Sequence, residues 1–176
     1  MKAIKLFLVL LGVLFVSHYA AAQNISTTIK VQAMDMGNAF IKNDFAAFVK
    51  FMHPGIIAFA GGKEKLKQRM DTAYEAFKRF GMSIKRYSIG NPGKIVNYKN
   101  QLQTVLPVST TLRNALVEIT AETTMIVISA DKGKNWWFID TNIYRMDSLK
   151  TVLPGLSAEL VIPGRKEPKI VPVQNK

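Results

Sequence analysis

Residues 117–129 read Val-Glu-Ile-Thr-Ala-Glu-Thr-Thr-Met-Ile-Val-Ile-Ser, and this stretch decides the fold class. Glu and Thr fill the even positions from 118 to 124, whereas most odd positions carry apolar or small side chains. The alternation and the β-branched content predict a long, half-buried strand. Residues 112–122 taken alone also fit a helix, but their β-branched content favours the strand. Such a strand spans roughly 43 Å, so a small sheet that contains it is expected to be strongly curved.

Further elements around this strand predict an α+β domain with a mainly antiparallel sheet. Asp44 is the expected N-cap of a short helix. The apolar run 56–60, bounded by Pro-Gly and Gly-Gly, predicts a short buried strand. Periodicity and turn residues predict the other elements: helices over 26–42, 45–52, 63–80 and 147–153, strands over 82–89, 101–112 and 136–144, and a turn over 97–100.

The amino-terminal residues have the three features of a cleavable signal peptide. Lys2 and Lys5 charge the start, residues 6–16 are apolar, and residues 20–22 are all Ala. The apolar stretch is eleven residues long, whereas a membrane-spanning helix needs about 20. We therefore expect cleavage between Ala22 and Gln23 to remove residues 1–22. The product is expected to reach the periplasm or the extracellular medium.

The remainder of the chain has the length of one domain with a single core. We expect that domain to occupy residues 23–153 and an extended tail to occupy residues 154–176. Four prolines favour the extended conformation. The apolar patch 160–162 is expected to dock on the domain, and the part beyond Pro168 is expected to fray.

Charge and cysteine content restrict the partners. Without the leader, 22 Lys and Arg face 12 Asp and Glu, a net charge of +10. Export excludes nucleic acid and leaves anionic lipid headgroups, acidic polysaccharides or acidic proteins, although the dispersed basic residues also fit a solvated surface without a partner. The sequence has no cysteine, which excludes disulfides, thiolate metal sites and a lipidated amino-terminal cysteine. The product is therefore expected to diffuse without a lipid anchor.

Four short motifs carry a resemblance to a known superfamily. They are 39–45 (Ala-Phe-Ile-Lys-Asn-Asp-Phe), 52–55 (Met-His-Pro-Gly), 61–62 (Gly-Gly) and 136–140 (Trp-Trp-Phe-Ile-Asp). Together with the order of the expected elements, they make residues 25–150 resemble the nuclear transport factor 2-like superfamily, which includes SnoaL-like proteins. The segments 153–156 and 162–163 are similar to the ends of exported bacterial members of unassigned role.

The resemblance implies that three N-terminal helices pack on a strongly curved sheet and form a cone with a pocket inside. Enzymes of the superfamily, such as ketosteroid isomerases, SnoaL-like polyketide cyclases and scytalone dehydratases, place a carboxylate or a histidine in that pocket. No enzyme motif aligns with this chain residue by residue, so the resemblance assigns no catalytic residue. Members often dimerise through the sheet, which makes a homodimer a further expectation.

Residues 129–136 fit the pattern Ser-x-Asp-x-Gly-x-x-Trp, which resembles the Asp-box hairpin of sialidases and other β proteins. Asp131 can accept hydrogen bonds from turn amides, Gly133 can take a positive φ, and Trp136 can cover the hairpin. These roles and that of Ser129 fold a turn and need no substrate. We therefore interpret the motif as structural.

Two residues are candidates for acid–base chemistry. His53, the only histidine after the leader, lies at a predicted helix end, where capping carbonyls or packing against the core is favoured over a role as general base. Asp140 lies beside aromatic residues at the end of the last long strand and could act as an acid or base in an apolar cavity. Its parity with Trp136 and Phe138 leaves open whether it points inward or outward.

Other residues with possible binding roles have simpler interpretations. Glu118 and Glu122 lie about 13 Å apart along one strand face, beyond the roughly 9.5 Å limit of a two-carboxylate mechanism, so we expect them to face solvent and pair with lysines. The sequence predicts no metal site and no cofactor, because one histidine and no cysteine remain. Candidate pocket-lining aromatic residues, which at helical spacing are more often core residues, are Phe40, Tyr74, Phe77, Tyr98 and Trp137.

We therefore expect an exported, non-enzymatic domain that binds a small apolar ligand or a protein partner in or near a cone-shaped pocket. Two alternatives remain. One is a small isomerase, cyclase or dehydratase that uses Asp140 or His53. The other is a basic module that interacts with an anionic envelope surface.

Overall fold

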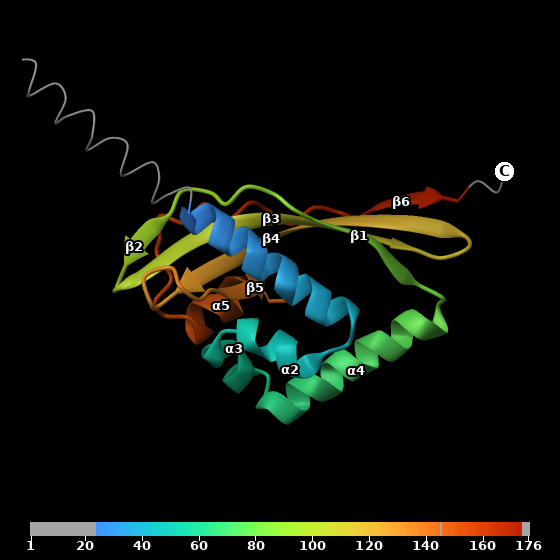
Figure 1. Ribbon diagram of the computed structural model, residues 1–176, viewed down its shortest axis with the longest axis horizontal. Coiled ribbons are helices and arrows are strands. Elements are labelled where there is room, and N and C mark those ends of the chain that lie inside the picture. The colour runs from blue at the N-terminus through green and yellow to red at the C-terminus, as the bar shows by residue number, and fades with distance from the viewer. Residues whose placement is uncertain (1–23, 145, 174–176) are drawn as a thin grey trace, which may run out of the picture.

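The computed structural model describes residues 24–144 and 146–173. The expected signal peptide, with its cleavage site at Ala22 and Gln23, lies outside the described residues. Within them the chain is α+β, with helices and an antiparallel sheet, as the sequence predicts (Figure 1). The helices of this part of the chain fall short of the length and hydropathy that a membrane crossing requires.

Two long strands form the centre of the sheet. They are β3 (Gln101–Arg113) and β4 (Val117–Ser129), which pair along almost their whole length. Each has two short strands along its other edge. These are β1 (Ser83–Ile89) and β2 (Val96–Tyr98) beside β3, and β5 (Trp137–Asp140) and β6 (Lys169–Pro172) beside β4. The long strand expected at residues 117–129 is confirmed.

The sequence did not predict β2 and β6. A turn was expected over residues 97–100, but Lys99 and Asn100 alone turn the chain, with φ of 49° and 62°. Fraying was expected beyond Pro168, but β6 pairs with residues 117–120 of β4. All four residues of β6 are exposed, so no burial pattern marks this strand in the sequence.

Four α-helices precede β1 among the described residues, whereas three were expected. The additional helix is α3 (Pro54–Phe59), which replaces the strand predicted at residues 56–60. Pro54 fits the first turn of a helix, and His53 caps it because Nδ1 accepts a hydrogen bond from the Gly55 amide at 3.0 Å. The others are the N-terminal helix (24–41), α2 (Phe45–Phe48), which is followed by a 3₁₀ turn, and α4 (Lys63–Arg79).

Capping explains where the N-terminal helix gives way to α2. Asn43 adopts a positive φ of 54° after the first helix. The carboxylate of Asp44 then accepts a hydrogen bond from the Ala47 amide at 3.0 Å, which confirms the predicted cap.

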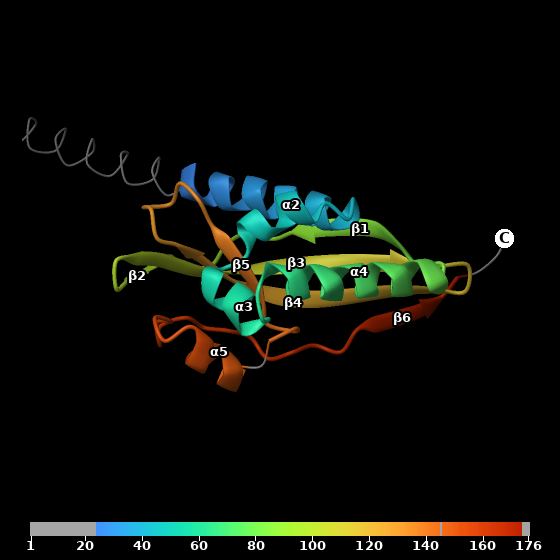
Figure 2. The ribbon, with the colours of Figure 1, turned by 90° about the horizontal axis from the view of Figure 1, so that it is seen from below.

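Apolar clusters cover both faces of the sheet. Ile29, Ala33 and Met36 of the N-terminal helix pack on the inner face, which we define as the face that carries Met125 and Phe138. Side chains of opposite parity in β4 and β5 pack with α3, the start of α4 and α5 (Met146–Val152). The tail docks on this second cluster, as expected, through Leu156, Leu160 and Ile162. Figure 2 shows α4 running along β3 and β4.

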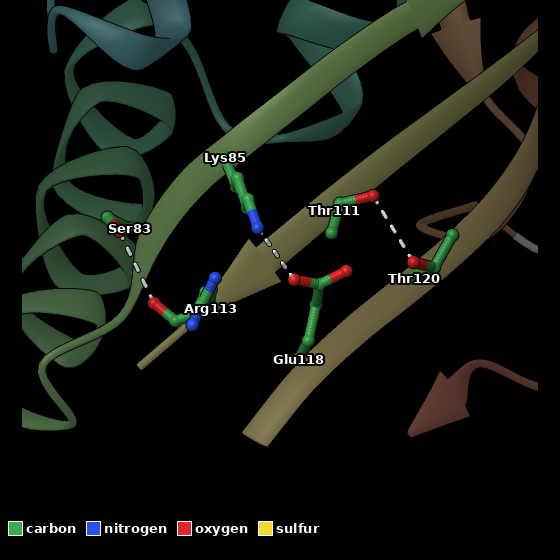
Figure 3. Close-up of polar contacts among 6 residues, drawn as sticks. All are labelled: Ser83, Lys85, Thr111, Arg113, Glu118 and Thr120. Carbon is green, nitrogen blue, oxygen red and sulfur yellow. Dashed lines mark hydrogen bonds and ion pairs between the residues drawn. The ribbon is translucent and has the colours of Figure 1, made fainter. Parts of the chain in front are cut away.

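Polar contacts join β1, β3 and β4 where β3 ends and β4 begins (Figure 3). Lys85 forms an ion pair with Glu118 at 3.2 Å, and the hydroxyl groups of Thr111 and Thr120 are 3.2 Å apart. Glu122 pairs with Lys166 of the tail at 2.7 Å. Both glutamates therefore pair with lysines, as predicted.

Candidate functional site

A cavity of about 470 Å³ lies between the inner face of the sheet and the helices. This volume falls within the roughly 300–1,000 Å³ of ligand pockets. Six lining residues are polar: Arg69, Tyr87, Thr110, Thr123, Asp140 and Tyr144. The apolar lining consists of Met36, Gly37, Phe40, Ile41, Phe48, Met52, Phe59, Leu66, Met70, Ala73, Ile84, Val108, Met125, Phe138 and Ile143.

One face of α4 forms the wall opposite the sheet. It contributes Leu66, Arg69, Met70 and Ala73, which are spaced three, one and three positions apart and therefore share a helix face. Leu66 and Met70 are buried, whereas Arg69 is exposed. Arg69 therefore adds a charged, exposed side chain to an otherwise apolar wall.

Tyr87 reaches the cavity because β1 is irregular. The register between β1 and β3 shifts between Ile84 and Arg86, so Ile84 and Tyr87, three positions apart, both line the cavity. The Tyr87 ring lies against Gly37 of the N-terminal helix so closely that a Cβ atom there would overlap it. The Tyr87 hydroxyl is buried and has no hydrogen-bond partner in the described part of the chain.

Asp140 points into the same cavity from the end of β5. It shares this orientation with Phe138. Asp140 therefore points inward, which its parity with Trp136 and Phe138 had left open. Its Oδ1 accepts hydrogen bonds from the Thr123 hydroxyl and the Asn142 amide, both at 2.7 Å. No described residue donates a hydrogen bond to Oδ2.

The polar side chains of the cavity influence one another. Burial raises the pKa of Tyr87 to about 12, and the negative charge of Asp140 contributes in the same direction. Burial also raises the pKa of Tyr144, an effect that the positive charge of Arg69 opposes and Asp140 reinforces. The two tyrosines therefore stay protonated at neutral pH and keep their hydrogen-bond donors.

The structure brings one of the five aromatic candidates to the cavity, namely Phe40. Phe77 packs edge-on against Phe40, with ring centroids 6.4 Å apart, outside the lining. Tyr74 lies beside Lys78 on α4, and Tyr98 lies beside Lys99 at the β2–β3 hairpin. Trp137 belongs to the cluster on the other face of the sheet.

His53 and Asp140 do not share a cavity, because His53 is absent from the lining described above. Its ring packs edge-on against Trp137 with centroids 4.9 Å apart. Burial lowers the pKa of His53. The residue caps amides of the following helix rather than the carbonyls that the sequence suggested. This arrangement gives His53 a structural role.

The structure places Ser129, Asp131, Gly133 and Trp136 in one hairpin. The Gly133 amide donates to the Ser129 hydroxyl at 2.9 Å, and the Trp136 indole donates to the Gly133 carbonyl at 3.0 Å. Asp131 accepts hydrogen bonds from Asn135, Ser129 and Lys134, which hold its pKa down at about 2. These contacts are internal to the turn.

Five polar lining residues were not among the candidates that the sequence indicated: Arg69, Tyr87, Thr110, Thr123 and Tyr144. Arg69 was detectable, because it falls within the stripe formed by the apolar residues of α4. Tyr87 was not, because the irregularity of β1 breaks the alternation that assigns faces. Within residues 24–144 and 146–173, no group of three or more His, Cys, Asp or Glu gathers as a metal site requires.

Comparison with known proteins adds no relative. No model of a protein family, no curated protein and no solved structure matches the chain.

Proposed function

We propose that the protein is an exported, non-enzymatic domain whose cavity binds a small, largely apolar molecule that carries a hydroxyl group. The observation that carries this proposal is the buried Tyr87 hydroxyl, which has no partner within the described residues, in a mainly apolar cavity. An unsatisfied buried polar group costs about 1–3 kcal/mol. A ligand that supplies the missing partner recovers part of this free energy.

The chemistry of the two facing groups selects the ligand. Tyr87 can donate a hydrogen bond, and the free Oδ2 of Asp140 can accept one. A ligand hydroxyl group both accepts and donates, so it can pair with either residue. A ligand carboxylate cannot donate and is repelled by Asp140.

Three probes of similar length test the selection: 1-decanol, decyl methyl ether and decane, measured by displacement of Nile red from residues 23–176. We expect the alcohol to bind about tenfold more tightly than the ether, the effect of one added hydrogen bond. Asp140→Asn should reduce this preference, whereas Tyr87→Phe should weaken binding of the alcohol and of the ether alike relative to decane, because both probes accept from Tyr87. The Asn variant keeps the Oδ1 acceptor and converts Oδ2 into a donor. Tyr98→Phe, outside the cavity, is the control, and equal affinities for all three probes would contradict the proposal.

Filling the cavity tests where the probe binds. Ala73 lines the cavity from α4, so Ala73→Phe should abolish binding of 1-decanol. Gln68 is exposed on the same helix and does not line the cavity. Gln68→Phe therefore adds the same ring without filling the site and should bind like the wild type.

An enzyme of the isomerase, cyclase or dehydratase kind is the second candidate, favoured by the free Oδ2 of Asp140 beside a phenol in an apolar cavity. Our proposal expects the bound molecule to be recovered unchanged after prolonged incubation. Chemical conversion that disappears in Asp140→Asn would support the enzyme instead.

Export and family membership are parts of the same proposal. The helices before an antiparallel sheet, with a cavity between them, support a cone of the nuclear transport factor 2-like kind. Export is supported by the leader sequence. Expression of the full chain in a Gram-negative host should yield a periplasmic product whose mass corresponds to a start at Gln23. A product that retains residue 1 would contradict export.

A further inference from the structure

Apolar side chains at one mouth of the cavity reach the surface. Phe59 and Ile143 both line the cavity, yet they are 53% and 71% exposed. The Phe59 ring packs against Tyr144 with centroids 6.4 Å apart, which joins α3 to the segment after β5. Exposed apolar side chains beside a pocket mark a site of interaction more often than isolated ones do.

Elements that line the cavity near this mouth carry cationic residues. Arg69 lines the cavity, is exposed, and makes no hydrogen bond or ion pair with a described residue. Lys63 and Lys65 are exposed on the first turn of α4, which begins four residues after Phe59. Neither lysine forms an ion pair with an acidic residue among the described residues. Glu64 is the one acid of that turn. The guanidinium of Arg165 binds the carbonyl oxygen and Oδ1 of Asn142, next to Ile143.

We propose that this face docks on an anionic lipid bilayer, with Phe59 and Ile143 at the acyl boundary and Lys63, Lys65 and Arg69 among the headgroups. Such a surface offers an apolar interior for Phe59 and Ile143 and negatively charged headgroups for the cationic residues. Apolar side chains insert into the bilayer, while cationic side chains remain at its charged interface. An acidic polysaccharide offers the charge but no apolar phase. An exported chain of net charge +10 meets anionic headgroups at the envelope surface.

The geometry gives this docking a use. An apolar ligand is poorly soluble in water and concentrates in bilayers. With its mouth on the bilayer, the cavity can exchange such a ligand without exposing it to water. The docking itself goes beyond ligand binding and does not depend on it.

Cosedimentation of residues 23–176 with vesicles tests the docking. One set contains phosphatidylcholine alone, and the other contains equal parts of phosphatidylcholine and phosphatidylglycerol. We expect binding to the anionic set only, and its loss in high salt. Lys63→Gln with Lys65→Gln should weaken it roughly tenfold or more, and Phe59→Ser with Ile143→Ser should do so by a similar factor.

Matched variants control for net charge and for exposed apolar area. Lys99→Gln with Lys132→Gln removes two charges at the turns of the β2–β3 and β4–β5 hairpins, and Val161→Ser removes an apolar side chain that is 82% exposed on the tail. These variants should bind like the wild type, as should Tyr87→Phe, which impairs only the cavity. Equal losses in mouth and control variants would overturn the proposal. Retention on dextran sulfate without vesicle binding would overturn it too.

Discussion

Tyr87 and Asp140 face the same cavity from opposite edges of the sheet, and the charge of Asp140 adds to the burial that raises the pKa of Tyr87 to about 12. The phenol and the carboxylate therefore place a hydrogen-bond donor and an acceptor in the wall of one cavity. Around them the lining is mostly apolar.

Tyr87→Phe should stabilise the ligand-free protein while it weakens ligand binding. The variant removes a buried hydroxyl without a partner among the described residues, so the free energy of unfolding should rise by about 1 kcal/mol. Urea denaturation of both proteins measures the difference. Tyr98→Phe, at an exposed position, should change little, and a large loss of stability in Tyr87→Phe would show that the hydroxyl has a partner.

Alkaline pH should destabilise the wild type through Tyr87. Its folded pKa of about 12 exceeds the ordinary value of 10, so the unfolded chain releases the proton first and the free energy of unfolding falls between these pH values. The full difference corresponds to roughly 3 kcal/mol. Denaturation at pH 9 and at pH 11 should show a smaller fall in Tyr87→Phe. Equal falls in both proteins would mean that Tyr87 titrates normally.

Gly37→Ala should destabilise the protein, although Gly to Ala inside a helix ordinarily stabilises by up to about 1 kcal/mol. The new Cβ would overlap the Tyr87 ring, so we expect a loss of roughly 1–3 kcal/mol in the free energy of unfolding. Adding Tyr87→Ala to the Gly37→Ala variant should relieve the overlap and restore part of the lost free energy of unfolding. Gly164→Ala, which meets nothing within 4 Å, is the matched control. A stabilising Gly37→Ala would contradict the packing.

Acidification should destabilise the protein through His53. Burial lowers its folded pKa, so the unfolded chain binds the proton first and stability falls as the pH drops below the ordinary value of 6.5. Protonation of Nδ1 also removes the acceptor for the Gly55 amide. His53→Asn keeps a cap without titrating there. Its melting temperature should therefore change less than that of the wild type between pH 7.5 and 5.5, and parallel curves would refute this role.

Acid pH below 4 tests the hairpin. Hydrogen bonds from Asn135 and other turn groups hold the pKa of Asp131 at about 2, so its contribution to stability is present above its ordinary value of 3.8 and is lost as the pH falls toward 2. At pH 5, Asp131→Asn should have a lower melting temperature than the wild type. At pH 2, the difference between the two melting temperatures should be smaller. Asp35→Asn, exposed on the N-terminal helix, should leave both values unchanged.

Periodicity predicted the elements whose sequences repeat with the period of a helix or of a strand. These are the N-terminal helix, α4, β1, β3 and β4. It could not predict α3, because the run 56–60 is uniformly apolar and only the His53-Pro54 cap distinguishes a helix from a strand there. It could not predict β6 either, because backbone pairing with β4 places this exposed strand.

The candidate site was predictable in part. Asp140 and Phe40 were named from the sequence, and both line the cavity. Tyr87 was hidden by the register shift in β1, which moves it to the face of Ile84. Trp137, a candidate for the pocket lining, packs on the other face of the sheet, because an aromatic-rich strand end does not reveal which of two adjacent rings points inward.

Methionine methyl groups allow the most direct test of ligand binding in the cavity. Met36, Met52, Met70 and Met125 line it, whereas Met34 and Met82 do not. In a ¹³C-methyl-methionine spectrum of residues 23–176, saturating 1-decanol should shift the four lining resonances together and leave those of Met34 and Met82 in place. Unchanged lining resonances, or shifts confined to Met34 and Met82, would contradict the account.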